Sequence, residues 1–362
     1  GLTSADALLT GTDNIAIGRL AFSASTDGAD NIAIGRSALA VSGNDGDANI
    51  AIGHAALGTG DVSGIHNIGI GASAAAAVTT GICNVAIGKN ALAAATTGCL
   101  NIAIGELAMG ATIVTGTNNI AMGLTSLDAL TGGTDNIAIG RLAASATPDG
   151  ADNIAIGRMA LAVSDGVADC NIAIGLSALG GADVSGLANI AIGALSADAL
   201  TTGICNVAIG TNALGAGTTA CQNVAIGELA MGTGTNVAIG SIAIGVSAGA
   251  AITSGACNVM IGACAGKAMT LGLNNVFIGR QAAEGITTEV VDDNVAIGRQ
   301  ALLGSASTTG DSNIAIGVQA MCDLTTGKQN IAMGNSAGGA LTTGCSNVAI
   351  GCLALSNSTT GN

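Results

Sequence analysis

Asn-Val-Ala-Ile-Gly-Lys-Asn-Ala-Leu, residues 84–92, is one copy of a pattern that recurs along the whole 362-residue chain. Its first five residues, Asn-Ile/Val-Ala-Ile-Gly, return after 17 or 18 residues at almost every step. A fixed short period is the sequence signature of a solenoid, in which each repeat forms one coil and packs on its neighbours. The copies begin at Asn14, Asn31, Asn49, Asn67, Asn84, Asn101, Asn119, Asn136, Asn153, Asn171, Asn189, Asn206, Asn223, Asn258, Asn275, Asn294, Asn313, Asn330 and Asn347.

A twentieth copy begins at Ser241, where Ser replaces Asn within the 35-residue interval between Asn223 and Asn258. The sequence therefore predicts an all-β protein, a β-solenoid of about 20 coils of 17–18 residues that forms an elongated rod. Residues 236–240 repeat the motif out of phase, and we expect them to be turn sequence. In that register Ile242 and Ile244, and not Val237 and Ile239, occupy the regular strand positions.

A longer repeat lies above the short one, because residues 1–122 align with residues 123–244 at a constant offset of 122. Residues 245–362 keep the coil period but have diverged. We predict one continuous solenoid over residues 1–362 that grew by duplication. The chain begins without an initiator Met or a leader and ends within a repeat, and we expect a processed chain or a segment of a longer protein.

Within each coil, apolar residues alternate with period two, which is typical of a short strand. We predict that the two Ile/Val positions point into the coil, that the Ala between them points outward, and that the closing Gly makes a corner. The recurring Asn is either a functional surface row or an internal ladder of hydrogen-bonded amides, and the ladder is favoured.

The residue between the two Ile/Val positions is Ala in seventeen of twenty coils, and Gly69, Met260 and Phe277 are the exceptions. A flat apolar stripe of this kind is usually buried against a partner. The alternative is that the coil geometry leaves no room for a larger residue there. The interface reading predicts contacts through Ala16, Ala33, Ala51, Ala86, Ala103, Met260 and Phe277.

The composition excludes several classes of protein. The chain has 58 Gly, no Trp, no Tyr and two Phe, so its core must be aliphatic. The formal net charge of −14 disfavours nucleic acid and anionic lipid as partners. Recurring Asn and Gly interrupt every apolar run, so we expect no membrane span.

Ten Cys and a cluster of acids are the chemical candidates. The coil register brings Cys83 near Cys99, and Cys205 near Cys221, so each pair could form a disulfide, and buried thiols are the alternative. The carboxylates in neighbouring turns are a weak calcium site, and solvated turn acids are the commoner explanation. These carboxylates are Asp27, Asp30, Asp45 and Asp47.

The motif Asn-x-Ala-Ile-Gly-x-x-Ala-Leu, followed by a Thr-Thr-Gly turn, resembles the repeats of phage tail-fibre and related surface-fibre proteins. It is also similar to the head repeats of trimeric autotransporter adhesins, whose coils are shorter. The resemblance runs from Asn14 to Gly361. It implies a shaft in which three parallel solenoids associate.

We therefore expect a non-catalytic structural or adhesive fibre that is extracellular or lies on a virion or cell surface. Its partners would be copies of itself, as a homotrimer or filament, and a cell-surface or glycan receptor. Neither His54 nor His66 has a recurring catalytic partner, so we expect no enzyme and no cofactor other than the weak calcium candidate. Arg19, Arg36, Arg141 and Arg158 share one column and are interpreted as solubilising. An ice- or carbohydrate-binding solenoid is the alternative function.

Overall fold

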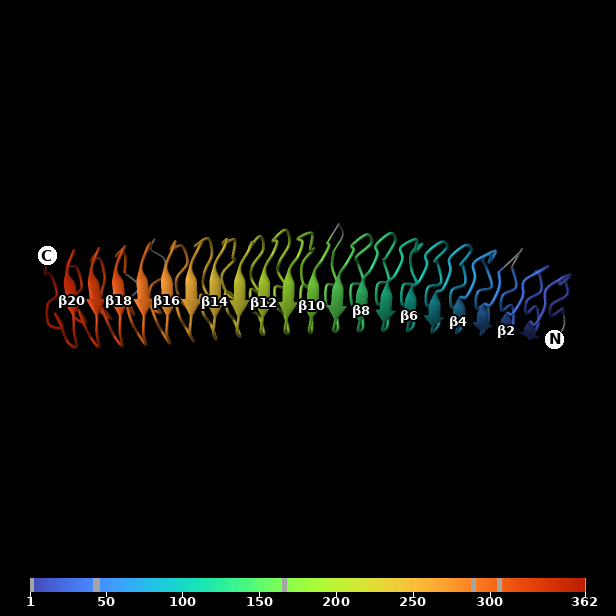
Figure 1. The fold of residues 1–362 in the computed structure, drawn as a ribbon, viewed down its shortest axis with the longest axis horizontal. Coiled ribbons are helices and arrows are strands. Elements are labelled where there is room, and N and C mark those ends of the chain that lie inside the picture. The colour runs from blue at the N-terminus through green and yellow to red at the C-terminus, as the bar shows by residue number, and fades with distance from the viewer. Residues whose placement is uncertain (1–2, 42–45, 165–167, 288–290, 305–307, 362) are drawn as a thin grey trace. The chain divides into compact units, whose positions relative to one another are not determined.

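The computed structural model describes residues 3–41, 46–164, 168–287, 291–304 and 308–361. The chain divides into two compact units, Gly1–Ser185 (unit 1) and Gly186–Asn362 (unit 2). Each unit is a stack of coils, and each coil contributes one three-residue strand to a parallel sheet (Figure 1). The predicted β-solenoid is confirmed.

Every strand coincides with the three central residues of one sequence motif. In unit 1 the strands are β1 (Ile15–Ile17), β2 (Ile32–Ile34), β3 (Ile50–Ile52), β4 (Ile68–Ile70), β5 (Val85–Ile87), β6 (Ile102–Ile104), β7 (Ile120–Met122), β8 (Ile137–Ile139), β9 (Ile154–Ile156) and β10 (Ile172–Ile174). In unit 2 they are β11 (Ile190–Ile192), β12 (Val207–Ile209), β13 (Val224–Ile226), β14 (Ile242–Ile244), β15 (Val259–Ile261), β16 (Val276–Ile278), β17 (Val295–Ile297), β18 (Ile314–Ile316), β19 (Ile331–Met333) and β20 (Val348–Ile350).

Consecutive strands within each unit pair in parallel, with equivalent residues side by side. Ile102 of β6, for example, pairs with Val85 of β5 and with Ile120 of β7. The coils that start at Asn275 and Asn294 are 19 residues long, slightly above the predicted period. The described residues contain no helix, and hence none that could cross a membrane.

The prediction that the Ile/Val positions point inward is wrong, because the Ile/Val side chains lie on the outer side of the strand and the residue between them lies on the inner side. The central residue of the strand is buried and its two neighbours are partly exposed, as in β6, where Ala103 is 0% exposed. The predicted interface residues lie inside the solenoid. Ala16 in the first coil is partly buried, whereas Ala33, Ala51, Ala86, Ala103, Met260 and Phe277 are 0% exposed.

A thin interior explains this orientation. A Cβ added at Gly69, the centre of β4, would lie 3.0 Å from the carbonyl oxygen of Ala74 and 3.3 Å from Cγ of Leu57. The wall opposite this strand is therefore so close that even a methyl group would be crowded at Gly69, and a side chain as large as Ile would not fit there. Larger side chains fill the core from the opposite wall, at the fourth residue after the motif Gly, as Leu92 and Leu214 do.

Met260 and Phe277 keep the interior volume constant in a different way. Here the opposite wall carries Gly249 and Gly266, and a Cβ on Gly266 would lie 2.9 Å from Sδ of Met260 and 3.1 Å from Cδ2 of Phe277. Bulk on the strand is thus offset by Gly on the facing wall, as close packing requires.

The corners use backbone conformations that are rare for residues other than Gly. The motif Gly confirms its predicted role: Gly88 has φ +131°, and a Cβ there would lie 2.6 Å from the carbonyl oxygen of Gly105. In coil after coil, three further residues adopt the left-handed region, as Asn90, Leu92 and Leu100 do around β5 and β6. Such residues cost energy individually. Their N–H groups are used between coils, since Asn90 N–H donates to the carbonyl of Ala72 and Leu92 N–H to that of Ala108.

The expected register around residues 236–245 is confirmed, although the direction of the side chains is not. Ile242 and Ile244 lie in β14, in line with Val224 and Ile226 of β13, but on the outer face. Val237 and Ile239 lie before β14, and Ile239 forms an isolated parallel bridge with Cys221 of the preceding coil.

Candidate interaction face

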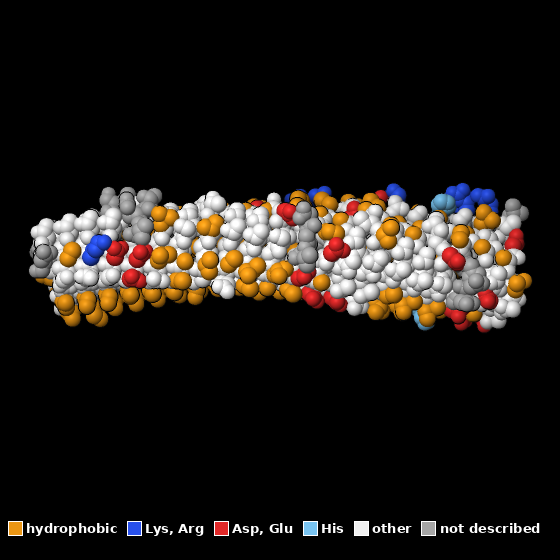
Figure 2. Space-filling model, turned by 90° about the horizontal axis from the view of Figure 1, so that it is seen from above, with side chains coloured by type: hydrophobic (Ala, Val, Ile, Leu, Met, Phe, Trp, Pro, Cys, Tyr) orange, Lys and Arg blue, Asp and Glu red, His pale blue; other side chains and the backbone are white. Residues whose placement is uncertain are grey.

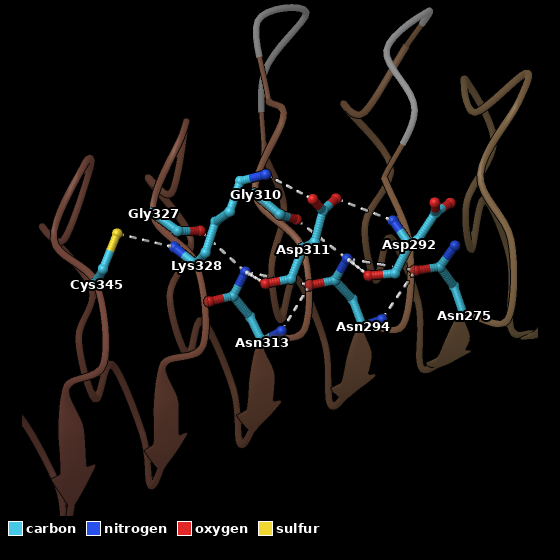
Figure 3. A network of polar contacts seen from close by, with 9 residues as sticks. All are labelled: Asn275, Asp292, Asn294, Gly310, Asp311, Asn313, Gly327, Lys328 and Cys345. Atoms are coloured by element: carbon cyan, nitrogen blue, oxygen red, sulfur yellow. Dashed lines mark hydrogen bonds and ion pairs between the residues drawn. The ribbon is translucent and has the colours of Figure 1, made fainter.

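The recurring Asn residues form an internal ladder, as predicted. In unit 2, the backbone N–H of Asn294 donates to Oδ1 of Asn275 (3.0 Å), and that of Asn313 donates to Oδ1 of Asn294 (2.9 Å) (Figure 3). Each side-chain amide also donates to a turn carbonyl, as Asn313 Nδ2 does to Gly327 (3.0 Å). These amides are buried, so the ladder holds coils together and is not presented to a ligand.

Ser241 takes part in the same ladder. Its N–H donates to Oδ1 of Asn223 (2.9 Å), and its hydroxyl accepts the N–H of Asn258 (3.1 Å). A hydroxyl can therefore replace the acceptor half of the amide.

A second acceptor column lies two residues before the ladder Asn. Oδ1 of Asp311 accepts the N–H of Asp292 (3.2 Å), and Sγ of Cys345 accepts the N–H of Lys328 (3.4 Å) in the same way (Figure 3). In unit 1, Asp47 accepts the N–H of Ala29 (2.7 Å) and Cys99 that of Ile82 (3.4 Å). At this position the side chains of both Asp and Cys thus accept a backbone N–H from the preceding coil. The sequence motif did not predict this role.

No disulfide joins the ten described cysteines, so neither predicted bridge is formed. Cys83 directly precedes its ladder Asn and Cys99 stands two residues before the next one, so the two belong to different columns. Cys99 instead points to the backbone, donating to the carbonyl of Thr97 (3.3 Å). Cys221 makes the equivalent contact with Thr219 (3.3 Å). Burial and then Asp323 raise the pKa of Cys322 to about 11, so this thiol stays protonated at neutral pH.

Two of the four candidate calcium ligands make hydrogen bonds within the turns. Asp27 accepts the hydroxyl of Thr26 (2.6 Å), Asp47 accepts a backbone N–H, and Asp30 is exposed. Asp45 lies outside the described residues. Among the described residues, no group of three or more His, Cys, Asp or Glu is arranged to hold a metal ion, and no pocket is found there.

The first and third residues of the strands form what we call the outer Ile/Val face. In β1–β10 of unit 1 and again in β11–β20 of unit 2, these positions hold only Ile, Val and Met. Neighbouring coils place equivalent side chains about 4.8 Å apart, and the two columns are about 6.6 Å apart along the strand. Ile87 is 36% exposed, Met122 39% and Ile244 36%. Each unit therefore presents an unbroken column of exposed or partly exposed apolar side chains at the third position and, beside it, an unbroken column of mostly partly exposed ones at the first.

In unit 2 the apolar surface extends to a further column. Figure 2 shows hydrophobic side chains in a continuous row along the lower edge of this unit. The residues two positions before the ladder are apolar over six successive coils, namely Leu187, Ile204, Cys221, Ile239, Ala256 and Leu273. Ile239 is 51% exposed and Leu187 43%.

The turn threonines are mostly engaged within the stack. The hydroxyl of Thr79 donates to the carbonyl of Thr96 (3.0 Å), and the hydroxyl of Thr325 to that of Thr342 (3.0 Å). The second Thr of each pair, such as Thr80 or Thr326, is exposed.

The comparisons with known proteins add no relative. No family model matches this chain, and a search of the curated proteins finds no match either.

Proposed function

We propose that this chain is a non-catalytic structural or adhesive fibre protein, and that it associates with copies of itself through the outer Ile/Val face. The single observation that carries this proposal is the pair of uninterrupted aliphatic columns on the strands of each unit.

Apolar patches of this extent are unusual on soluble monomers and mark interaction surfaces. A strand face exposed only to water would accommodate Thr, Ser or Lys, whereas none occurs in either column. The columns are also straight and regular, so an identical regular surface is a well-matched partner. The face that associates is thus the opposite side of the strand from the Ala column that the sequence favoured.

The resemblance to surface-fibre and adhesin-head repeats supports the same proposal. It favours a parallel homotrimer or a filament that is extracellular or displayed on a virion or cell surface, where it holds a recognition module away from its base. A cell-surface or glycan receptor would then be bound by that module.

The direct test replaces aliphatic residues on the face while keeping β-branched side chains in the strands. The variant Ile87→Thr/Ile104→Thr/Ile139→Thr changes three positions of the face. Its control is Ile113→Thr, which alters a turn residue that is 61% exposed. We expect multi-angle light scattering to show associated wild-type and control chains and a dissociated triple variant, with β-sheet circular dichroism unchanged. A monomeric wild-type chain at high concentration would refute the proposal.

A second test separates a scaffold from a protein with a single binding or catalytic site. Deletion of residues 123–244 removes seven coils and should shorten the fibre by about 34 Å, at about 4.8 Å per coil. Folding should be preserved, because coils contact only their neighbours. Loss of a specific turnover or small-molecule affinity, with no role for length, would contradict the scaffold function.

A further inference from the structure

Oppositely charged residues occur together in five coils. In these coils an Asp directly precedes the ladder Asn and an Arg directly follows the motif Gly, which gives Asp-Asn-Ile/Val-Ala-Ile-Gly-Arg. Every Asp that directly precedes a ladder Asn has such an Arg. The pairs are Asp13 with Arg19, Asp30 with Arg36, Asp135 with Arg141, Asp152 with Arg158, and Asp293 with Arg299.

Duplication accounts for part of this pattern, because the pairs of β8 and β9 are the copies of those of β1 and β2. It does not account for Asp293 and Arg299 of the β17 coil, which lies in the diverged third section. The pairing has therefore been established or kept in separate contexts.

The two members of a pair do not meet within the chain. They lie at opposite ends of the strand, and all ten side chains are exposed. Among the described residues the ion pairs are Lys89 with Glu106 and Lys328 with Asp311, and neither belongs to these coils. In unit 1, Figure 2 shows Lys and Arg along the upper edge, whereas acidic side chains lie along the lower edge and at other places on the face in view.

Local side-chain contacts of these residues are with His, Gln and Asn side chains. Arg36 contacts Nε2 of His54 (2.6 Å), Arg299 donates to Oε1 of Gln300 (3.2 Å), and Asp293 accepts from Asn274 (3.2 Å). In these five coils an Asp thus stands at the N-terminal end of the strand, on one side of the outer Ile/Val face, and an Arg stands at its C-terminal end.

Two such faces can be packed together in two ways. When the copies are parallel and related by rotation about the stacking axis, the N-terminal edge of each strand meets the C-terminal edge of its counterpart. Asp of one copy then lies against Arg of the same coil in its neighbour. When the copies are antiparallel about an axis along the strands, the acidic edge meets the acidic edge, which is repulsive.

The coils also select the register. In an assembly shifted by one coil, Arg19 of β1 would meet Asp30 of β2, but Arg36 would meet Ala48 of the β3 coil. Half of the charges in that pair of coils would lose their partner. Only the unshifted register of unit 1 matches all four of its pairs.

We propose that the Asp-Asn-Ile/Val-Ala-Ile-Gly-Arg coils fix the parallel, in-register alignment of neighbouring copies of this chain through intermolecular Asp–Arg ion pairs. This inference rests on the proposed self-association. The aliphatic columns supply the attraction, and the bordering charges supply its direction and register, which is what rim charges do best.

The test uses two full-length variants. The edge variant carries Asp13→Arg, Asp30→Arg, Asp135→Arg and Asp152→Arg, so both borders of unit 1 become basic. The exchange variant adds Arg19→Asp, Arg36→Asp, Arg141→Asp and Arg158→Asp, so the two borders trade places. Leu100 and Gln222 occupy the position of these Asp residues in other coils, so larger side chains are accommodated there.

We expect the edge variant to associate at least about tenfold more weakly than wild type at low salt, and to recover at about 1 M salt, where the Debye length is about 3 Å. This loss would occur although four changes of +2 bring the formal net charge from −14 to −6, which by itself reduces repulsion between chains. The exchange variant, whose net charge is unchanged, should associate as wild type does but should not mix with tagged wild-type chains in a subunit-exchange experiment.

Unchanged association of the edge variant, or free mixing of the exchange variant with wild type, would overturn this inference. If the Ile→Thr triple variant dissociates in the same assay, the proposed self-association stands while the register role falls. If wild type does not associate at all, the proposed function falls and takes the register role with it.

Discussion

The β7 coil of unit 1 and the β14 coil of unit 2 lie at equivalent positions of the repeat, 122 residues apart, and their interiors are packed differently. Asn119 in the first is Ser241 in the second, and Leu127 is Gly249. In the strand that follows, Ala138 of β8 corresponds to Met260 of β15. Leu127, Ala138 and Met260 are all 0% exposed.

The difference shows that the interior volume is fixed while its distribution between the walls is not. A Cβ on Gly249 would lie 2.5 Å from Cε and 2.8 Å from Sδ of Met260, so Met occupies the space that Leu127 fills in the β7 coil. The ladder position also differs between the two coils. The hydroxyl of Ser241 replaces the hydrogen-bond acceptor of the Asn side chain but not its amide donor. Substitutions that make one coil more like the other should separate these contributions.

The largest expected effect comes from the ladder. Oδ1 of Asn119 accepts the N–H of Asn136 (3.0 Å), and its Nδ2 donates to the carbonyl of Gly133 (2.9 Å). Asn119→Ala leaves both buried groups without a partner and should cost about 2–6 kcal/mol, at about 1–3 kcal/mol for each unsatisfied group. Hydrogen exchange of the β7 and β8 amides measures the loss locally.

Asn119→Ser is the matched control, because it recreates the residue of the β14 coil. Its hydroxyl should accept the N–H of Asn136 as Ser241 accepts that of Asn258, so about half of the loss should be recovered. Equal losses for Ala and Ser would mean that the acceptor half of the ladder contributes little.

The next effect tests the exchange of bulk between the walls. Gly249→Leu places the β7 side chain opposite Met260 and should destabilise the β14–β15 region by about 1–3 kcal/mol through overpacking. The double variant Gly249→Leu/Met260→Ala restores the pair found as Leu127 and Ala138, and most of the stability should return. Local hydrogen exchange again reports the change, and additive losses in the double variant would show that the two positions do not share one space.

The two coils also show what the sequence could predict. The period, the strand positions, the Gly corner and the Asn ladder follow from spacing and residue type, and all are present. The prediction of which side of the strand faces the core was wrong. Ile and Val were assigned to the core by hydrophobicity alone, whereas the position held by Ala in most coils is the buried one. Size, and not hydropathy, distinguishes the inner position here.

Other features depend on contacts that a motif does not contain. The left-handed backbone of Leu127 (φ +47°) carries no signal in a residue type that rarely adopts it. Cys99 and Cys345 accept backbone N–H groups at positions where other coils use Asp, which becomes visible only when the columns are aligned in space. The pairing of Met260 with Gly249 could have been found by comparing residues eleven apart in these two coils, where Leu127 and Ala138 stand at the equivalent positions.

The smallest expected effect concerns Asp128, whose counterpart in the β14 coil is the uncharged Ala250. Burial raises the pKa of Asp128 above its usual value, and hydrogen bonds from the backbone of Ala111 and Gly110 oppose the shift only in part. One carboxylate oxygen, Oδ1, is buried without a hydrogen-bond partner. The charged form is therefore disfavoured in the folded state.

The sign of the resulting pH dependence follows from this shift. Because the folded-state pKa lies above the unfolded value, the contribution of Asp128 to stability is fully present below the unfolded pKa and is lost as the pH rises through the folded pKa. Asp128→Asn, which keeps the shape and removes the titration, should abolish this component of the pH dependence. The measurement is the difference in thermal stability between wild type and variant from about pH 3 to pH 7, near and above the usual Asp pKa of about 3.9. The variant should gain on wild type as the pH rises, and a difference that stays constant over this range would show that Asp128 ionises as freely in the coil as it does in the unfolded chain.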